Sequence, residues 1–337
     1  MKLTSIILSI IFSAFLFTNV QAGGIEWKAQ THIKLPSGAV VLAYSADGSR
    51  IAVGHSDGNV SVWNVKSGES LHVLNAHSKK VNSVQFIRQD AQLLTIGDDN
   101  RARLWSTLNW SEAGIIEGVA FAGGVSPDGN WLVAQDPKQA IWIWDLATLK
   151  PVKELSGAGK GAGDTIGFTS DGKYIAAANL QPLLINIDTK QNFSFEGSGG
   201  KKTPLKIEQK GDQTSISLGS LQNDDAPTRR LIPSRVGSLV ALGRGWYGKP
   251  SFFDVWDVNA SKRLLRFTPK DGGSLTSFSF DNSLLAMDGS EKVTIMRIAT
   301  GKQESLIKGS GIMQFSPLSL ELAVSDGNDL TIYIPKQ

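Results

Sequence analysis

The sequence predicts an all-β protein: a seven-bladed β-propeller of four-stranded antiparallel blades, closed by the N-terminal strand completing the last blade. Three observations carry this prediction. One phrase recurs along the chain at intervals typical of propeller blades. Short alternating apolar runs are separated by Asp-Gly and related turns. Finally, the first repeat is preceded by a surplus strand, and the last repeat lacks one.

The recurring phrase is clearest at residues 44–69, YSADGSRIAVGHSDGNVSVWNVKSGE. Its Ser-x-Asp-Gly element returns in the variants VSPDG, FTSDG, FSFDN and FSPLS, and in the degenerate copy FIRQD. A second anchor, at the Trp-Asn pair of the phrase, returns at positions 63, 105, 144, 187, 256, 296 and 333. Successive anchors are 42, 39, 43, 69, 40 and 37 residues apart, so seven anchors predict seven blades within one domain, residues 23–337. The long interval places an insertion at about 196–229, before the fifth repeat, which reads as a small hairpin.

The residues within each repeat favour the same architecture. RIAVGH and NVSVWNV read as two strands, and the Ser-Asp-Gly between them suits a hairpin turn because Gly tolerates positive φ. Trp63, Trp144 and Trp256 have large flat side chains that suit the wedge between one blade and the next. A closed ring leaves no long exposed sheet edge.

Ring closure follows from the two ends. The last repeat ends with DLTIYI at 329–334, its third strand, whereas IEWKAQTHIKL at 25–35 precedes the first repeat without a blade of its own. We expect these two segments to pair.

The anchors and their spacing resemble the WD40-repeat family, and the resemblance covers nearly everything after the N-terminal segment. It implies a buried His, Ser/Thr, Asp and Trp network in each complete blade. One repeat supplies all four residue types, and the others lack the set, as in divergent bacterial repeats. That leaves TolB-like and YVTN-like secreted propellers as alternative relatives. The residues of the complete set, for which we expect a structural role, are His77, Thr95, Asp99 and Trp105.

The N-terminus, MKLTSIILSIIFSAFLFTNVQAGG, reads as a secretory signal peptide over residues 1–22, with an uncleaved anchor as the alternative. No integral membrane span is expected after cleavage. The chain has 0 cysteines, so disulfides and thiolate chemistry are excluded. An exported protein without disulfides indicates a bacterial periplasmic or secreted location.

Composition and motifs argue against several functions. A net charge of +3 is too small to indicate a nucleic-acid partner. The 4 histidines have no metal-ligand spacing, and the Asp98-Asp99-Asn100 segment is read as an ordinary turn rather than a calcium site. The Gly159-Lys160 pair lacks the Ser or Thr of a phosphate-binding loop. No cofactor and no metal are expected.

Three breaks in the repeat map to one face of the ring, which we call the top face. It carries the loops from the last strand of one blade to the first of the next, and the hairpins between second and third strands. The breaks are residues 156–164, which contain Lys160, the insertion at about 196–229, and GRGWYGKP at 243–250. We expect them to form one partner-binding surface, in which aromatic residues supply contact area at low entropic cost. The alternative is that the aromatic pair packs beneath the inserted hairpin. The candidate contact residues are Arg244, Trp246, Tyr247, Lys249 and Lys160.

The sequence therefore predicts an exported, non-catalytic scaffold that binds another protein through its top face. The alternative is a lactonase-like or dehydrogenase-like propeller enzyme, or a small-ligand sensor, with its site at the mouth of the central channel. Convergence of the hairpin carboxylates there would favour this alternative; these are Asp57, Asp99, Asp136, Asp288 and Asp326.

Overall fold

The structure of the protein is a computed structural model. It describes residues 24–155, 166–170, 172, 174–177, 183–186, 192–194, 206–210, 213–217, 228–234, 236–244, 252–257, 260, 262–268, 274–289 and 291–336. The regular secondary structure of this part of the chain consists of β-strands. It contains no helix long and apolar enough to cross a membrane.

Six sheets are four-stranded antiparallel blades, in which consecutive strands pair from the innermost to the outermost. Blades 1 to 3 follow one another along the chain: β2 (Ala39–Tyr44), β3 (Arg50–His55), β4 (Val60–Asn64) and β5 (Ser70–Leu74); β6 (Val81–Ile87), β7 (Gln92–Gly97), β8 (Arg101–Ser106) and β9 (Glu112–Glu117); β10 (Ala120–Val125), β11 (Trp131–Gln135), β12 (Ile141–Asp145) and β13 (Lys150–Glu154). Blades 4 and 5 are β20 (Thr228–Pro233), β21 (Leu239–Arg244), β22 (Phe252–Asp257) and β23 (Lys262–Phe267), then β24 (Ser274–Phe278), β25 (Leu284–Asp288), β26 (Lys292–Arg297) and β27 (Lys302–Lys308). The closing blade is β28 (Met313–Phe315), β29 (Leu322–Asp326), β30 (Asp329–Pro335) and β1 (Trp27–Lys34).

The prediction of seven four-stranded antiparallel blades is wrong, because the described residues form six such blades in the ring. Between blades 3 and 4 lies a six-stranded mixed sheet in the order β14-β15-β16-β17-β19-β18. The hairpin predicted in the insertion is present, and it joins this sheet through a parallel pairing of Asn192 with Gln213 instead of standing apart. The strands of the mixed sheet are β14 (Ile166–Phe168), β15 (Tyr174–Ala177), β16 (Leu183–Asn186), β17 (Asn192–Ser194), β18 (Lys206–Lys210) and β19 (Gln213–Ser217).

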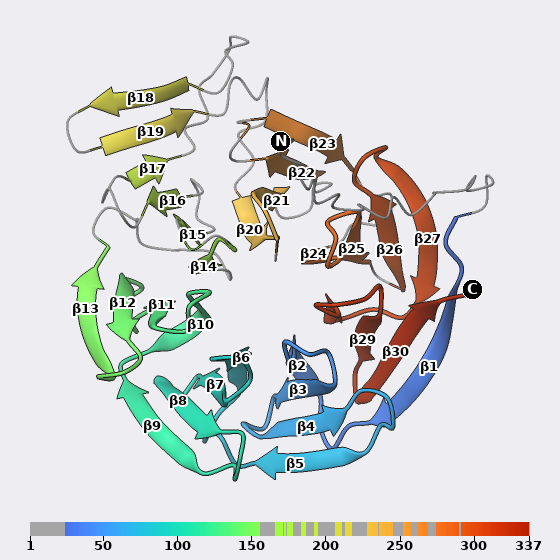
Figure 1. Cartoon of the computed structure of the whole chain (residues 1–337), viewed down its shortest axis with the longest axis horizontal. Helices are drawn as coiled ribbons and strands as arrows, with labels where there is room; N and C mark the ends of the chain where they lie inside the picture. Colours follow the sequence, from blue (N-terminus) through green and yellow to red (C-terminus); the bar gives the residue numbers. More distant parts are fainter. Residues whose placement is uncertain are drawn as a thin grey trace, which may run out of the picture.

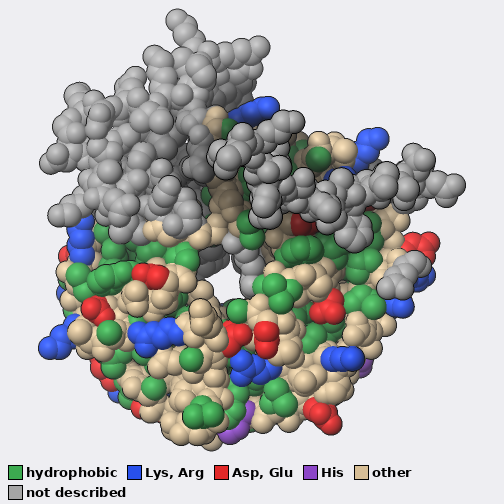
Figure 2. Space-filling model, viewed as in Figure 1, with side chains coloured by type: hydrophobic (Ala, Val, Ile, Leu, Met, Phe, Trp, Pro, Cys, Tyr) green, Lys and Arg blue, Asp and Glu red, His purple; other side chains and the backbone are tan. Residues whose placement is uncertain are grey.

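The sheets stand in a ring with their first strands innermost (Figure 1), and the space-filling view shows an opening at the centre of the ring (Figure 2). The interfaces between neighbouring blades are apolar. Three of them contain a tryptophan that packs against the preceding blade. Trp105 packs with blade 1, Trp144 with blade 2 and Trp63 with the closing blade. Burial of such side chains stabilises the fold by roughly 1.5–3 kcal/mol each. At these three interfaces a tryptophan therefore packs between neighbouring blades.

Ring closure is confirmed by the pairing of β1 with β30, which brings residues about 300 positions apart into one sheet (Figure 1). The antiparallel register runs from Trp27 opposite Pro335 to Lys34 opposite Asp329. Lys34 Nζ lies 3.1 Å from the Asp329 carboxylate. A further tie is the Gln314 side chain of β28, whose Oε1 accepts a hydrogen bond of 3.1 Å from the backbone N–H of Tyr44 in blade 1.

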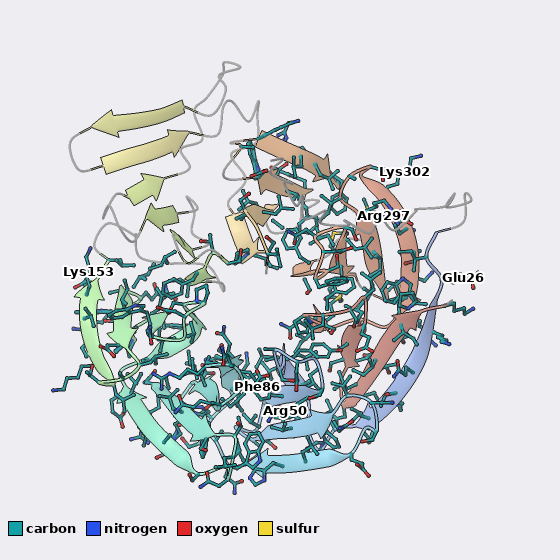
Figure 3. The ribbon with its side chains drawn as sticks, in the orientation of Figure 1. Glu26, Arg50, Phe86, Lys153, Arg297 and Lys302 are labelled. Carbon is teal, nitrogen blue, oxygen red and sulfur yellow. The ribbon has the colours of Figure 1, made fainter. Side chains whose placement is uncertain are left out.

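Side chains also join neighbouring blades on the face opposite the top face, the bottom face. Arg50 of blade 1 places its guanidinium 5.2 Å from the ring centre of Phe86 in blade 2 (Figure 3). The Asp90 carboxylate accepts hydrogen bonds of 2.8 and 2.9 Å from the Ala46 backbone N–H. Asp90 has a left-handed backbone with φ of 67°, so this contact holds a turn that is otherwise unfavourable for a non-glycine residue. Blades 1 and 2 are consequently joined on the bottom face.

Candidate interaction surface

The predicted contact residues fall largely outside the described part of the chain. Lys160, Trp246, Tyr247 and Lys249 lie outside the described residues. Arg244 is the last residue of β21, where its backbone pairs with Phe252, but its side chain is not described. The described top face is therefore built from the loops and hairpins of blades 1 to 3, blade 5 and the closing blade.

The blade 2 residues that the sequence singles out lie together beneath the top face. His77 comes from the loop before β6, Thr95 from β7, Asp99 from the hairpin after β7, and Trp105 from β8. The His77 Nδ1 atom lies 2.8 Å from Asp99 Oδ1, and its Nε2 atom lies 2.9 Å from Thr95 Oγ1. Trp105 Nε1 donates to the same Thr95 oxygen over 3.0 Å. Four segments of the blade are thereby joined by one chain of hydrogen bonds.

The donors and acceptors of this chain fit a neutral imidazole at His77. An ionised carboxylate only accepts, so His77 Nδ1–H donates to Asp99. Trp105 N–H only donates, so the Thr95 oxygen accepts from Trp105 and its hydroxyl hydrogen goes to His77 Nε2. That arrangement pairs all four side chains with a neutral imidazole, and Arg103 Nη1, which lies 3.1 Å from the same His77 Nδ1, then donates to Asp99 Oδ2 instead. A second proton on His77 Nε2 would make the Thr95 oxygen accept from both rings, and the Thr95 hydroxyl hydrogen would lose His77 as its acceptor.

Burial also favours the neutral form of His77. Its removal from water lowers the pKa of the imidazole, and this outweighs the opposite influence of the Asp99 carboxylate. Burial raises the pKa of Asp99, but the hydrogen bonds that its carboxylate accepts from His77, Arg103 and the Ser78 backbone N–H outweigh it and leave the pKa below its usual range. Arg103 Nη1 lies 3.1 Å from Asp99 Oδ2. A neutral histidine beside an ionised aspartate therefore forms this part of the blade.

Blade 1 contains a second network of the same kind that the sequence reasoning missed. Trp63 Nε1 donates to Ser61 Oγ over 2.7 Å, Ser61 Oγ lies 2.6 Å from His55 Nε2, and His55 Nδ1 lies 3.0 Å from the Ser37 carbonyl oxygen. A backbone carbonyl here replaces the aspartate. His55 ends β3 rather than preceding the blade, so the expected order of residue types did not reveal it. The signal available was Ser61 two residues before Trp63, which places both side chains on one face of a strand.

The remaining predicted structural tryptophan, Trp256, is buried in blade 4. Its indole Nε1 has no hydrogen-bond partner among the described residues. The guanidinium of Arg263 lies 5.9 Å from its ring centre. Trp256 thus serves packing rather than a polar network.

The two networks hold the top-face loops of blades 1 and 2 against each other. The His77 backbone N–H donates to the Gly58 carbonyl over 2.9 Å, and the Ser78 N–H donates to Asp99 Oδ2 over 3.3 Å. Gly58 has a φ of +93°, and a Cβ atom there would lie 2.1 Å from the His77 carbonyl oxygen. Only glycine permits this approach. Contact residues on these loops would be presented on a rigid support.

One aromatic side chain of the top face is exposed on an irregular strand. Phe121 lies at the start of β10, the innermost strand of blade 3, and is 43% exposed. Its φ is 62°, which is rare for a bulky residue. The pairing of β10 with β11 shifts between Ala120 and Gly124, so Phe121 is bulged out of register. The Gln135 side chain, at the β11 position opposite Ala120, is 4% exposed, and its Nε2 has no acceptor among the described residues.

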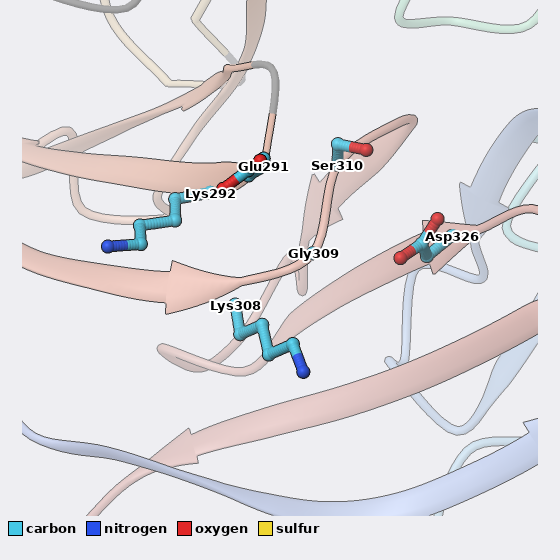
Figure 4. A pocket seen from close by; sticks show the side chains of 6 residues that line it. All are labelled: Glu291, Lys292, Lys308, Gly309, Ser310 and Asp326. Atoms are coloured by element: carbon cyan, nitrogen blue, oxygen red, sulfur yellow. The ribbon is translucent and has the colours of Figure 1, made fainter.

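A pocket opens on the same face between blade 5 and the closing blade (Figure 4). Its volume is about 370 Å³, and its walls mix charges: Glu291, Lys292, Lys308 and Asp326 line it with the Gly309-Ser310 loop. Both signs of charge are also interspersed on the face shown in Figure 2. Within the described ranges, no three His, Asp or Glu side chains lie close enough to hold a metal ion.

Comparisons with known proteins agree with this geometry. The family model of the anaphase-promoting complex subunit 4 WD40 domain matches residues 26–91. The β-propeller domain of Cps50 (Swd1) from Myceliophteria thermophila superposes with a TM-score of 0.73 at 14% identity, covering 91% of this chain and 99% of that chain. The chain shares the β-propeller fold of WD40-repeat proteins. The predicted resemblance is thereby confirmed.

Curated WD40 relatives match parts of the chain. Protein tipD of Dictyostelium discoideum is 38% identical over 263 residues, which are 75% of this chain and 40% of that protein. The DDB1- and CUL4-associated factor 11 homolog of Caenorhabditis briggsae is 28% identical over 132 residues, 36% of this chain and 24% of that protein. Autophagy-related protein 16 of Arabidopsis thaliana is 28% identical over 113 residues, 32% of this chain and 22% of that protein. The WD40 propeller therefore spans less than half the length of each.

Proposed function

We propose that this WD40 propeller is an exported, non-catalytic scaffold that binds another protein on its top face. The observation that carries the proposal is Phe121, an aromatic side chain 43% exposed at the innermost edge of that face. Left-handed backbone costs a non-glycine residue roughly 1–2 kcal/mol. A residue that retains an exposed ring at such a cost, in a bulged strand, fits a contact role better than a packing role.

The surroundings of Phe121 support this role. The adjacent loops of blades 1 and 2 are tied down by the His55 and His77 networks, so a partner would meet a surface that loses little freedom on binding. Aromatic residues are enriched among the side chains that contribute most to protein interfaces. The partner-binding residues predicted in the 156–164 loop and in the 243–250 turn belong to this same proposal; they are Lys160, Arg244, Trp246, Tyr247 and Lys249.

The relatives favour a scaffold over an enzyme. One of them is named for its association with DDB1 and CUL4, and the WD40 fold is used generally to bind proteins. We extend this role to the present chain, without transferring those partners to it. The channel-mouth enzyme would need converging carboxylates, whereas no three His, Asp or Glu side chains among the described residues lie close enough to hold a metal ion.

Export is proposed from the N-terminal segment. Residues 1–22 have a charged start at Lys2, an apolar run and a small residue at Ala22, the pattern of a cleaved signal. Mass spectrometry of the protein purified from the periplasm or culture medium of its source organism should give a mature N-terminus at Gly23. Recovery of uncleaved protein from the cytoplasm would contradict the export proposal and would leave the binding proposal unaffected.

The binding proposal is tested by cross-linking the tagged protein in its source organism and capturing its partners. We expect Phe121→Ala to reduce capture of the principal partner at least tenfold, as for a residue that contributes over about 1.4 kcal/mol to binding. The melting temperature should stay unchanged, because the Phe121 ring is partly exposed and belongs to none of the described core clusters. Leu108→Ala is the matched control, since Leu108 is 93% exposed on a bottom-face turn. Equal capture by the wild type and Phe121→Ala would overturn the proposal.

A further inference from the structure

The bottom face carries a groove at the junction where the ring closes. It lies between the first hairpin of blade 1, the turn between β4 and β5, and the first hairpin of the closing blade, and Gln30 of β1 lines its side. Its volume is about 1000 Å³. That is the upper end of the range for ligand pockets, roughly 300–1,000 Å³, and it accommodates several residues of an extended chain. We call it the closure groove.

The carboxylates of the closure groove have neutral hydrogen-bond partners. The hydrogen bond from the Ser45 hydroxyl lowers the pKa of Asp47, and the charge of Arg50 contributes to this lowering. Asp47 accepts hydrogen bonds from the Ser49 hydroxyl at 2.8 Å, and Glu69 accepts one from the Ser67 hydroxyl at 3.1 Å. Glu321 is half-buried, and this burial raises the pKa of its carboxyl above the ordinary value. No Lys or Arg nitrogen among the described residues lies within 4.0 Å of any of the three.

The net charge of the groove follows from its lining. Three carboxylates, Asp47, Glu69 and Glu321, face one ammonium group, that of Lys66, so the formal sum is −3 + 1 = −2. These carboxylates come from three separate turns and are not gathered closely enough to hold a metal ion within the described ranges. Negative charge spread along a groove complements positive charges spread along an extended segment.

The rim of the groove adds an apolar contact. Leu318, in the first hairpin of the closing blade, is 62% exposed. The remaining lining is largely hydroxyl and amide groups, such as Ser319 and Asn64, which exchange hydrogen bonds readily with a peptide backbone. A ligand that carries cationic side chains, a polar backbone and at least one apolar side chain satisfies all three kinds of surface.

We propose that the closure groove binds an extended basic peptide segment of a partner protein, with its Lys or Arg side chains on Asp47, Glu69 and Glu321 and an apolar side chain on Leu318. This site lies on the face opposite Phe121 and does not rest on the top-face proposal. A scaffold with both sites would hold two partners at once.

The test uses fluorescence polarisation with the mature protein and a labelled peptide, Gly-Lys-Leu-Lys-Gly-Lys-Leu, at about 50 mM NaCl, where exposed charges are weakly screened. We expect saturable binding that weakens steeply with salt, and none to the same peptide with Glu in place of Lys. Glu69→Gln and Glu321→Gln should each weaken binding roughly three- to tenfold. Leu318→Ala should weaken it by a similar factor at both low and high salt.

Two controls keep the proposal falsifiable. Glu154→Gln removes the same charge from an exposed position on β13 and should leave the affinity unchanged within about 1.5-fold. Phe121→Ala should also leave it unchanged, which separates this site from the top face. Absence of peptide binding, or equal weakening by Glu154→Gln and Glu321→Gln, would overturn the closure groove as a binding site. Circular dichroism melts of each variant establish that the proteins compared are folded.

Discussion

Replacing Thr95 by Val removes one buried hydroxyl and nothing else of comparable size. Thr95 is fully buried, and its oxygen serves both His77 Nε2 and Trp105 Nε1. The substitution leaves one acceptor and one donor unpaired inside the blade, each at a cost of about 1–3 kcal/mol. The expected loss is therefore about 2–6 kcal/mol, because the His77 side chain is 0% exposed and water does not replace its lost donor.

Urea unfolding followed by tryptophan fluorescence measures this loss. The chain offers a matched control in Thr331, whose hydroxyl lies 3.0 Å from His32 Nδ1 but on the exposed surface of the closing blade. Thr331→Val should change the free energy of unfolding by less than about 0.5 kcal/mol, because water replaces the lost partner. Equal losses for the two variants would refute the argument that burial, rather than the threonine–histidine contact itself, sets the cost.

Three further predictions follow from the same geometry. Burial lowers the pKa of both His55 and His77, so below about pH 6.5 the unfolded chain binds more protons than the folded chain. The free energy of unfolding should then fall by up to about 1.4 kcal/mol per pH unit for each histidine. A urea midpoint that stays constant between about pH 7.5 and 5.5 would contradict this. Gly58→Ala should destabilise far more than Gly118→Ala, because a Cβ at Gly58 would meet the His77 carbonyl at 2.1 Å, whereas nothing lies within 4 Å of one at Gly118, where only positive φ costs about 1 kcal/mol; similar melting temperatures would show that the loops yield. Ile33→Ala on β1, where the side chain is 2% exposed, should cost about 2–5 kcal/mol, and a loss below about 1 kcal/mol in urea unfolding would mean that β1 contributes little to ring stability.

The propeller and its closure could be predicted because both depend on local patterns that repeat. Alternating apolar residues and Ser-x-Asp-Gly turns recur wherever a blade recurs, and Trp63, Trp105 and Trp144 lie at the interfaces where their size indicated. The pairing of β1 with β30 followed from a missing strand at one end and an extra strand at the other. Such deficits are visible in sequence because each blade needs the same number of strands.

The blade count was wrong for a physical reason. The hairpin β18–β19 reads as a separate insertion, but its backbone groups hydrogen-bond to the edge strand β17, which extends one sheet to six strands. Backbone pairing of this kind depends little on side-chain identity, so a count of side-chain anchors does not register it.

The candidate sites were harder to predict than the fold. The His55 network was missed because its acceptor is the Ser37 carbonyl, and a backbone oxygen has no signature in the sequence. Phe121 was missed because its exposure results from a bulge in β10. The closure groove was missed because its carboxylates come from turns that are adjacent only after the ring closes.

The seam between β1 and β30 sets the order of events in folding. The N-terminal strand leaves the ribosome or the export channel about 300 residues before its partner, so it remains unpaired while the intervening modules assemble. Contacts of such large sequence separation slow the final step, since the loop must close before any hydrogen bond of the seam forms. Until then the open circle exposes strand edges at both ends, and a chaperone that covers β1 would act only within that interval.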